Sequence, residues 1–251
     1  MSPDKKILVV EDNKEYMIAA IRALSELGRR EDIITAENYV VANMMLPKAD
    51  EVITDLFFPA SSRDKIFQLR EEAIQKIIAD QSGEKYADYI RGRLKGLGIE
   101  ADEALRKSLS NLGFNNQFGQ RDGEETVNAI MRFAECFEKE KDVGQRLSNI
   151  IDTTFFPESV QRLRERYFAP LKEYVKGGPN HQPLGYLVAK EAERSGKPFV
   201  IATSLRHSDG ALVPILNAVR ANGWKMVEGA DGSKADPVYW KQAYDLLRGK
   251  K

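Results

Sequence analysis

Short apolar runs rich in β-branched residues constrain the fold of this chain most. Residues 6–10 (KILVV) form the first run, and 32–36 (DIITA), 51–55 (EVITD) and 198–202 (PFVIA) are similar. Apolar side chains on both faces of a strand are typical of a parallel sheet that helices cover on both sides. We therefore expect strands at these four positions, and a fifth, shorter strand at 225–227 (KMV).

Apolar residues at helical spacing follow each of these runs. The expected helices cover residues 15–27, 39–45, 185–194, 210–221 and 237–247. Five alternating strand–helix units predict an α/β fold with a doubly wound, five-stranded parallel sheet. In such a sheet, ligands bind beyond the carboxyl ends of the strands.

One long helical segment interrupts this alternation. Residues 60–182 show no convincing strand pattern but several amphipathic helical stretches. The expected helices of this segment cover 64–79, 85–97, 102–112, 124–140 and 157–175. We therefore predict a discontinuous α/β domain, residues 1–59 plus 183–251, with an inserted all-α subdomain at 60–182.

The overall composition argues against several classes of partner. Lys plus Arg and Asp plus Glu both number 38, so the chain as a whole offers no electrostatic attraction to nucleic acid or to a membrane surface. Cys136 is the only cysteine and cannot form an internal disulfide. No apolar run is long enough for a signal peptide or a spanning helix. We expect a cytoplasmic protein that binds neither nucleic acid nor membrane.

Carboxylates follow two of the expected strands. Glu11 and Asp12 come directly after the first strand, and Asp55 ends the third. All three should meet at the switch point of a doubly wound sheet, where a bound hard cation such as Mg²⁺, a raised pKa or a nearby Lys or Arg would relieve their repulsion. A hydroxyl of Thr203 or Ser204, after the fourth strand, is placed to bind a phosphoryl oxygen. Each acidic residue alone would equally suit the cap of a helix or turn.

The segments KILVVEDN, VITDLFFP and PFVIATS, in this order, resemble the conserved segments of response-regulator receiver domains of two-component signalling. The resemblance implies a flavodoxin-like receiver fold. It also implies that Glu11 and Asp12 are the Mg²⁺-binding acidic pair and that Asp55 is the phosphoacceptor and a metal ligand. The backbone carbonyl of Phe57 would be a further metal ligand, and Thr203 would be the switch hydroxyl.

Two features of the receiver pattern are altered. The family's lysine before a proline, at the end of the fifth strand, has no counterpart here. Lys234, in the loop GADGSKADP, is the candidate to replace it by looping back, and Lys225 is the reserve. The aromatic residue that usually accompanies the switch hydroxyl is not evident, and Trp224 is the nearest aromatic in the sequence.

The resemblance implies a signalling protein rather than a turnover enzyme. Asp55 would accept a phosphoryl group, with Mg²⁺, from a sensor histidine kinase or a phosphotransfer protein in a phosphorelay. The signal would pass through protein contacts to an output partner that the sequence does not name. A homodimer stays open as an alternative state.

Two other functions remain open. In a haloacid-dehalogenase-like phosphatase, Asp55 would be the nucleophile, Thr203 or Ser204 would bind phosphate, Asp231 and Asp236 would form the late acidic loop, and residues 61–180 would form a helical cap. That family has the motif DxD at the nucleophile, with the second aspartate as general acid, and here Phe57 stands in place of that aspartate. The third reading is a degenerate receiver scaffold that is not phosphorylated.

Overall fold

A computed structural model describes residues 5–28, 32–61, 63–81, 168–178, 181–203, 212–229 and 232–249. Contacts divide the chain into two compact units, one of residues 1–78 and 171–251, the other of residues 79–170. We call the first the α/β unit. The helices expected at 85–97, 102–112 and 124–140, and most of that at 157–175, lie outside the described residues, and the predicted insertion boundaries stay a prediction.

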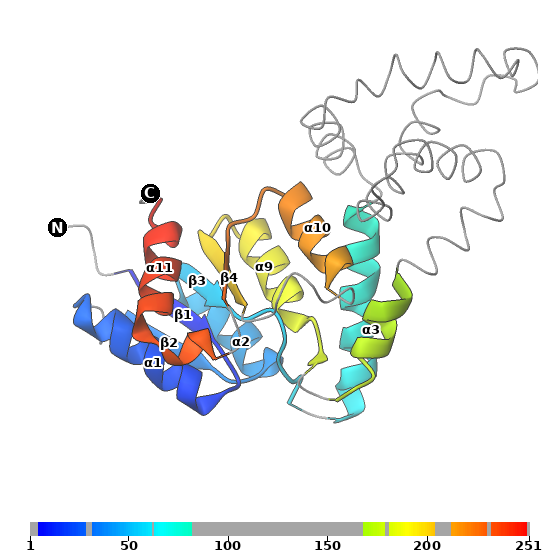
Figure 1. The fold of residues 1–251 in the computed structure, drawn as a ribbon, viewed down its shortest axis with the longest axis horizontal. Helices are drawn as coiled ribbons and strands as arrows, with labels where there is room; N and C mark the ends of the chain where they lie inside the picture. The colour runs from blue at the N-terminus through cyan, green and yellow to red at the C-terminus, as the bar shows by residue number, and fades with distance from the viewer. Residues whose placement is uncertain are drawn as a thin grey trace, which may run out of the picture. The chain divides into compact units, whose positions relative to one another are not determined.

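The α/β unit contains a five-stranded, all-parallel sheet (Figure 1). The strands are β1 (Ile7–Val10), β2 (Ile33–Ala36), β3 (Glu51–Thr54), β4 (Phe199–Thr203) and β5 (Met226–Glu228). Their order across the sheet is β2-β1-β3-β4-β5, and β1 pairs with both β2 and β3. The predicted fold class, a doubly wound parallel sheet of flavodoxin-like order, is confirmed. The switch point lies between β1 and β3.

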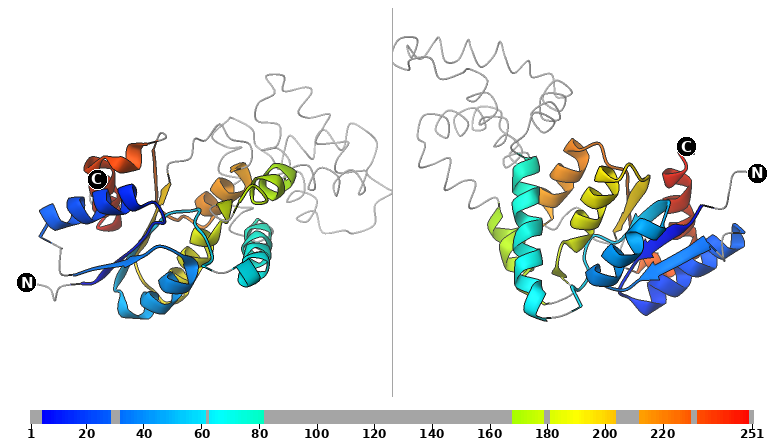
Figure 2. Two further views of the ribbon diagram at one scale, coloured as in Figure 1. Left: turned by 90° about the horizontal axis from the view of Figure 1, so that it is seen from below. Right: turned by 180° about the vertical axis from the view of Figure 1, so that it is seen from behind.

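Helices cover both faces of the sheet (Figure 2). Helices α1 (Lys14–Glu26) and α11 (Pro237–Leu247) pack on one face, where Ile7 and Val9 point. Helices α2 (Tyr39–Met45) and α9 (Leu184–Arg194) pack on the other, where Leu8 and Val10 point. Helix α10 (Val213–Ala221) lies beside α9, and α3 (Arg63–Asp80) contributes Ala73 to the second core. Alternate residues of β1 therefore enter separate cores, as its continuous apolar run predicts.

Polar caps fix the helix starts nearest the carboxyl edge of the sheet. The Asn13 side chain accepts hydrogen bonds from the N–H groups of Glu15 and Tyr16 at the start of α1. Asp236 caps α11 in the same way, and Pro237 occupies its first turn. A short 3₁₀ helix, η6 (Ser233–Ala235), precedes this cap, and another, η2 (Leu46–Lys48), precedes β3. The cap at Asn13 therefore fixes the start of α1 directly after Glu11 and Asp12.

None of the helices in the described ranges has both the length and the apolar character needed to cross a bilayer.

Candidate functional site

Three carboxylates gather where β1 and β3 end. The parallel ladder continues one residue past each strand, because Glu11 N–H donates to Ala36 O at 3.0 Å and Asp55 N–H donates to Val10 O at 2.9 Å. The side chains of Glu11, Asp12 and Asp55 each offer an oxygen, and these three oxygens lie within 4.8 Å of one another. The structure thus brings together the three acidic residues that the sequence singled out.

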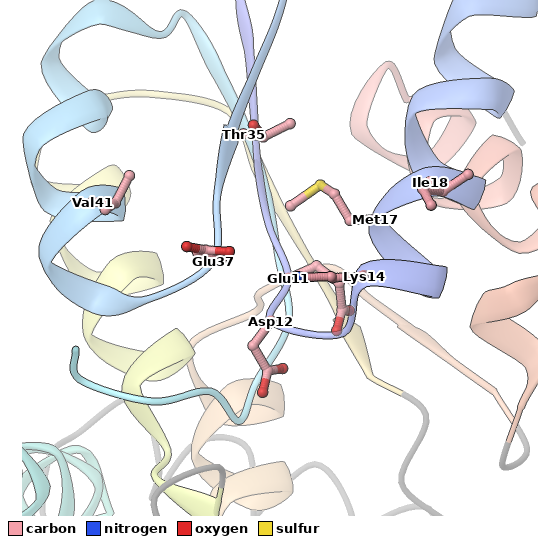
Figure 3. Close-up of a pocket in the computed structure, with 8 residues that line it drawn as sticks. All are labelled: Glu11, Asp12, Lys14, Met17, Ile18, Thr35, Glu37 and Val41. Atoms are coloured by element: carbon pink, nitrogen blue, oxygen red, sulfur yellow. The ribbon is translucent and has the colours of Figure 1, made fainter.

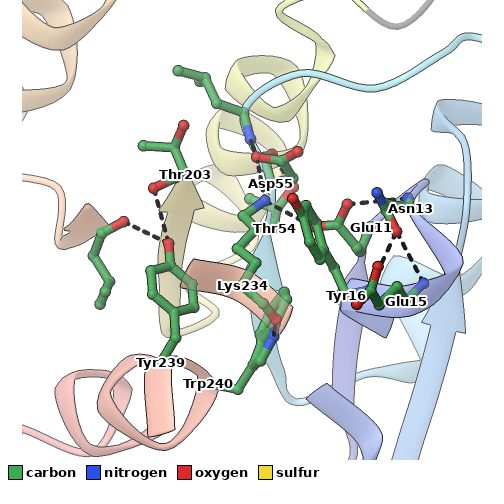
Figure 4. Close-up of polar contacts among 12 residues, drawn as sticks. Glu11, Asn13, Glu15, Tyr16, Thr54, Asp55, Thr203, Lys234, Tyr239 and Trp240 are labelled. Carbon is green, nitrogen blue, oxygen red and sulfur yellow. Dashed lines mark hydrogen bonds and ion pairs between the residues drawn. The ribbon is translucent and has the colours of Figure 1, made fainter. Parts of the chain in front are cut away.

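A buried lysine joins two of these carboxylates (Figure 4). Lys234 Nζ lies 2.7 Å from Glu11 Oε2 and 2.7 Å from Asp55 Oδ1. Lys234 is fully buried, and it reaches the site from η6, beyond the end of β5. Gly232, which begins this turn, has a φ of 80°, a conformation that glycine adopts without strain. The altered loop therefore returns a lysine to the edge of the sheet.

Lys225 does not lie in this site. It precedes β5, at the amino end of the strand, and its Nζ donates to Leu246 O at 3.0 Å on the surface. The site lies at the carboxyl end of the same sheet, so the strand separates Lys225 from Asp55. Only Lys234 of the two candidate lysines reaches the acidic cluster.

Glu11 is the most deeply engaged of the three acids. Its Oε1 accepts a hydrogen bond from Asn13 N–H at 3.1 Å and its Oε2 binds Lys234. Asp55 Oδ1 accepts a 2.6 Å bond from Leu56 N–H in addition to the ammonium. Glu11 is buried, whereas Asp12 is half-buried and the Asp55 side chain is 13% exposed. Asp12 and Asp55 are therefore the more accessible oxygen ligands.

Burial and mutual repulsion perturb the acidic residues. Burial, and then the charge of Asp55, raise the pKa of Glu11 to about 7. The same two causes raise the pKa of Asp12 to about 6. Burial works against the charge of Lys234, but Asp55 and Glu11 outweigh it, so the pKa of Lys234 is raised. One ammonium therefore neutralises the cluster only in part, and a cation of higher charge suits what remains.

The residues present fit a hard divalent cation. Three carboxylates supply oxygen ligands, which Mg²⁺ prefers, and the half-buried position of Asp12 leaves room for the waters that Mg²⁺ retains. Lys234 competes for the oxygens of Glu11 and Asp55. Asp12 and Asp55 are therefore the carboxylates best placed to hold such an ion.

Thr203 is the last residue of β4 and is buried. Its carbonyl oxygen accepts hydrogen bonds from Tyr239 Oη at 3.0 Å and from Gly229 N–H at 3.0 Å. These two hydrogen bonds hold the carboxyl end of β4, which carries the predicted switch hydroxyl of Thr203. Ser204 and Asp231, which the alternative readings used, lie outside the described residues.

Phe57, two residues after Asp55, is packed rather than exposed. Its ring meets Tyr174 edge-on at 5.2 Å between centroids, and Tyr174 stacks on His181 at 4.6 Å. Phe58 N–H donates to Gln182 O at 3.2 Å. The loop after the candidate phosphoacceptor is thus tied to Tyr174 and Gln182.

Sequence reasoning missed three residues that shape this site. Gly185 N–H donates to Leu56 O at 3.1 Å, and a Cβ atom on Gly185 would lie only 1.8 Å from Asp55 O. Tyr239 and Trp240, in the first turn of α11, are buried and bond to the loop and strand ends around Lys234. Burial is a tertiary property, so no local pattern of the sequence marked these residues. Trp224 instead packs against Tyr186 and Phe199.

A cavity of about 430 Å³ lies beside the acidic cluster (Figure 3). Glu11 and Asp12 belong to both, and Glu37 adds a third carboxylate to the cavity. Figure 3 shows Met17 and Ile18 of α1 on one side and Val41 of α2 on the other. The cluster therefore has an acidic, partly apolar depression next to it.

Comparison with known proteins gave no match to a protein-family model, to a curated protein or to a solved structure.

The raised pKa of Glu11 predicts a pH dependence of stability. Because the folded state holds this proton more tightly than the unfolded chain, stability should fall as the pH rises from about 4.5 to about 7. For Glu11 alone the fall is about 3 kcal/mol. Urea unfolding without divalent metal, at several pH values, should show this component in the wild type. Glu11→Gln should lack it, and parallel pH profiles of the two proteins would contradict the assignment.

Proposed function

We propose that this chain is a receiver-type phosphoacceptor module in which Asp55 takes up a phosphoryl group with the help of Mg²⁺. One observation carries the proposal. A buried ammonium binds two carboxylates that end different strands, with a third carboxylate beside them, at the switch point of a doubly wound parallel sheet. Such a group of charges suits phosphoryl transfer, which depends on positioning and on neutralising phosphoryl oxygens.

In the transfer step, a carboxylate oxygen of Asp55 forms a bond to the phosphorus of an acyl-phosphate or phosphohistidine donor. The bond from phosphorus to the donor breaks, and its electron pair leaves with the donor. Asp55 Oδ1 is oriented by Leu56 N–H and by Lys234, so we assign the attack to Oδ2. Bound Mg²⁺ would neutralise charge on the transferred oxygens.

Lys234 has a second task in this proposal. Before transfer its ammonium binds Glu11 and Asp55, and after transfer it remains beside the acyl phosphate. Thr203 lies on the neighbouring strand end and would offer its hydroxyl to a phosphoryl oxygen, as the receiver resemblance implies. The Phe57 carbonyl would complete the metal ligands in the same reading.

The partners that this function requires are a sensor histidine kinase or a phosphotransfer protein as donor, and an output protein as receiver of the signal. We place the relay in the cytoplasm, which suits the lone Cys136. The phosphatase reading gains no support from Asp236, because its Oδ1 accepts a hydrogen bond from Val238 N–H as the cap of α11. Asp236 therefore has a structural task in the position where that reading needs an acidic ligand.

The test is labelling with acetyl phosphate and Mg²⁺, followed by mass spectrometry. We expect one phosphoryl group per chain, mapped to Asp55, none in Asp55→Asn, and labelling that is about tenfold slower or more without Mg²⁺. Asp12→Asn should weaken the dependence on Mg²⁺. A label on another residue, or no label while Mg²⁺ binds, would contradict the proposal. Sustained release of phosphate that needs Asp55 would favour the phosphatase reading.

A further inference from the structure

Lys234 reaches the acidic cluster from a turn that α11 holds, and not from a strand. Strand β5 ends at Glu228, and Lys234 lies in the 3₁₀ helix η6 beyond it. Trp240 Nε1–H donates to Lys234 O at 2.7 Å, and both groups are buried. Figure 4 shows the indole of Trp240 beneath the backbone of this turn. The tryptophan therefore binds the very residue whose ammonium meets Glu11 and Asp55.

The ammonium of Lys234 also lies near two aromatic rings. Its Nζ lies 5.9 Å from the ring centroid of Tyr16, on α1, and 5.8 Å from that of Trp240. Both distances fall within the range of cation–π attraction, which gains strength where water is excluded. Two rings from separate helices thus lie near the ammonium that the two carboxylates bind.

Helix α11 is itself fixed to the strand ends. Tyr239 shares its hydroxyl proton between Thr203 O at 3.0 Å and Val227 O at 2.9 Å. Burial, and then the charges of Asp55 and Glu11, raise the pKa of Tyr239, so the hydroxyl remains a donor throughout the physiological range. The rings of Tyr239 and Trp240 meet edge-on at 5.7 Å. The first turn of α11 therefore fixes the backbone positions of both Thr203 and Lys234.

We propose that Trp240 is the positioning residue for Lys234, with Tyr239 anchoring the same turn of α11 to β4 and β5. In this arrangement α11 holds Lys234 in place, whereas the receiver pattern has its lysine at the end of the fifth strand. The proposal rests on the proposed function only for its effect on phosphoryl transfer. The position of Lys234 itself can be tested whether or not Asp55 is phosphorylated.

The variant Trp240→Phe keeps an aromatic ring and removes the N–H that binds Lys234 O. Trp224→Phe is its matched control, because Trp224 is also buried and its Nε1–H donates to Glu193 Oε1 at 3.1 Å, on the α9 side of the sheet. Acetylation of Lys234 by acetic anhydride, followed by peptide mass spectrometry, measures its protection. The exposed Lys225 serves as the internal reference.

In Trp240→Phe we expect Lys234 to be acetylated about tenfold faster, the effect of losing one buried hydrogen bond on local opening. Trp224→Phe should match the wild type. Mg²⁺ should bind more tightly to Trp240→Phe, because a loosened ammonium competes less for the carboxylates, while labelling of Asp55 slows. General structural damage would weaken both processes, so this pair of opposite changes identifies a positioning role.

Equal protection of Lys234 in the two tryptophan variants would overturn the proposal. If Trp240→Phe does not fold, 3-benzothienylalanine at position 240 removes the N–H while keeping the bicyclic shape, and the same criterion applies. If no protein accepts a phosphoryl group, the proposed function fails, and the acetylation rates alone decide whether Trp240 positions Lys234.

Discussion

Replacing Gly185 with alanine should lower the free energy of unfolding of the α/β unit by about 3 kcal/mol. The added Cβ would lie 1.8 Å from Asp55 O and 2.8 Å from Leu56 Cα. These are backbone atoms and cannot rotate away. Helix α9 would have to retreat from the end of β3, which would also loosen the packing of Leu184 and Leu187 in the core beneath it.

Tryptophan fluorescence during urea unfolding measures the free energy of unfolding of the α/β unit, in which Gly185 lies. The sequence contains two tryptophans, Trp224 and Trp240, and both belong to the α/β unit. Gly178→Ala is the control, because a Cβ there would meet no atom within 4 Å, and we expect it to change stability by less than about 0.5 kcal/mol. Similar losses in the two variants would mean that the close approach at Gly185 is not limiting.

Lys234→Met should destabilise the α/β unit by about 3–5 kcal/mol near neutral pH without metal, because it leaves buried carboxylates without their cation. Methionine fills a similar volume, so lost charge rather than lost packing dominates. Glu11 and Asp55 would then face each other across the space that the ammonium now occupies. Added Mg²⁺ should restore part of the lost stability, since it binds the folded state.

The deficit of Lys234→Met should shrink as the pH falls. Lys234 lowers the pKa of Glu11, so its removal raises that pKa above about 7, and protonation then relieves the repulsion. The contribution of Lys234 to wild-type stability is present below its ordinary pKa of 10.5 and is lost above its raised value. Lys225→Met is the matched control on the surface, with an expected change below about 0.5 kcal/mol. A deficit independent of pH would argue against a charge-based role.

The fold and the acidic part of the site follow from local patterns in the sequence. The continuous apolar run Ile7–Val10 predicts a strand buried on both faces, and the β-branched segment Glu51–Thr54 predicts another strand; the structure confirms both, and all of their residues are buried. Carboxyl ends of parallel strands share one edge of a sheet, so residues that follow two such strands must approach each other. Glu11, Asp12 and Asp55 could therefore be placed together without coordinates.

The lysine was harder to place, because a loop between strand and helix has no periodicity to constrain it. The sequence offered both Lys234 and Lys225 as candidates. The structure decides between them. Strand β5 begins at Met226, so Lys225 lies at the amino end of the sheet, whereas η6 follows the strand and brings Lys234 to the carboxyl end.

Gly185 and Trp240 could not be found from the sequence, since their importance arises from tertiary contacts that no local pattern marks. Gly185 is special because Asp55 O, 130 residues earlier, approaches it too closely for a side chain. Trp240 matters because its indole N–H meets the backbone of the turn that carries Lys234.

By itself, the sequence determined which carboxylates share the edge of the sheet, because strand polarity is encoded locally. Only the tertiary structure decided which cation neutralises them and what holds it there, because burial and long-range packing select that partner.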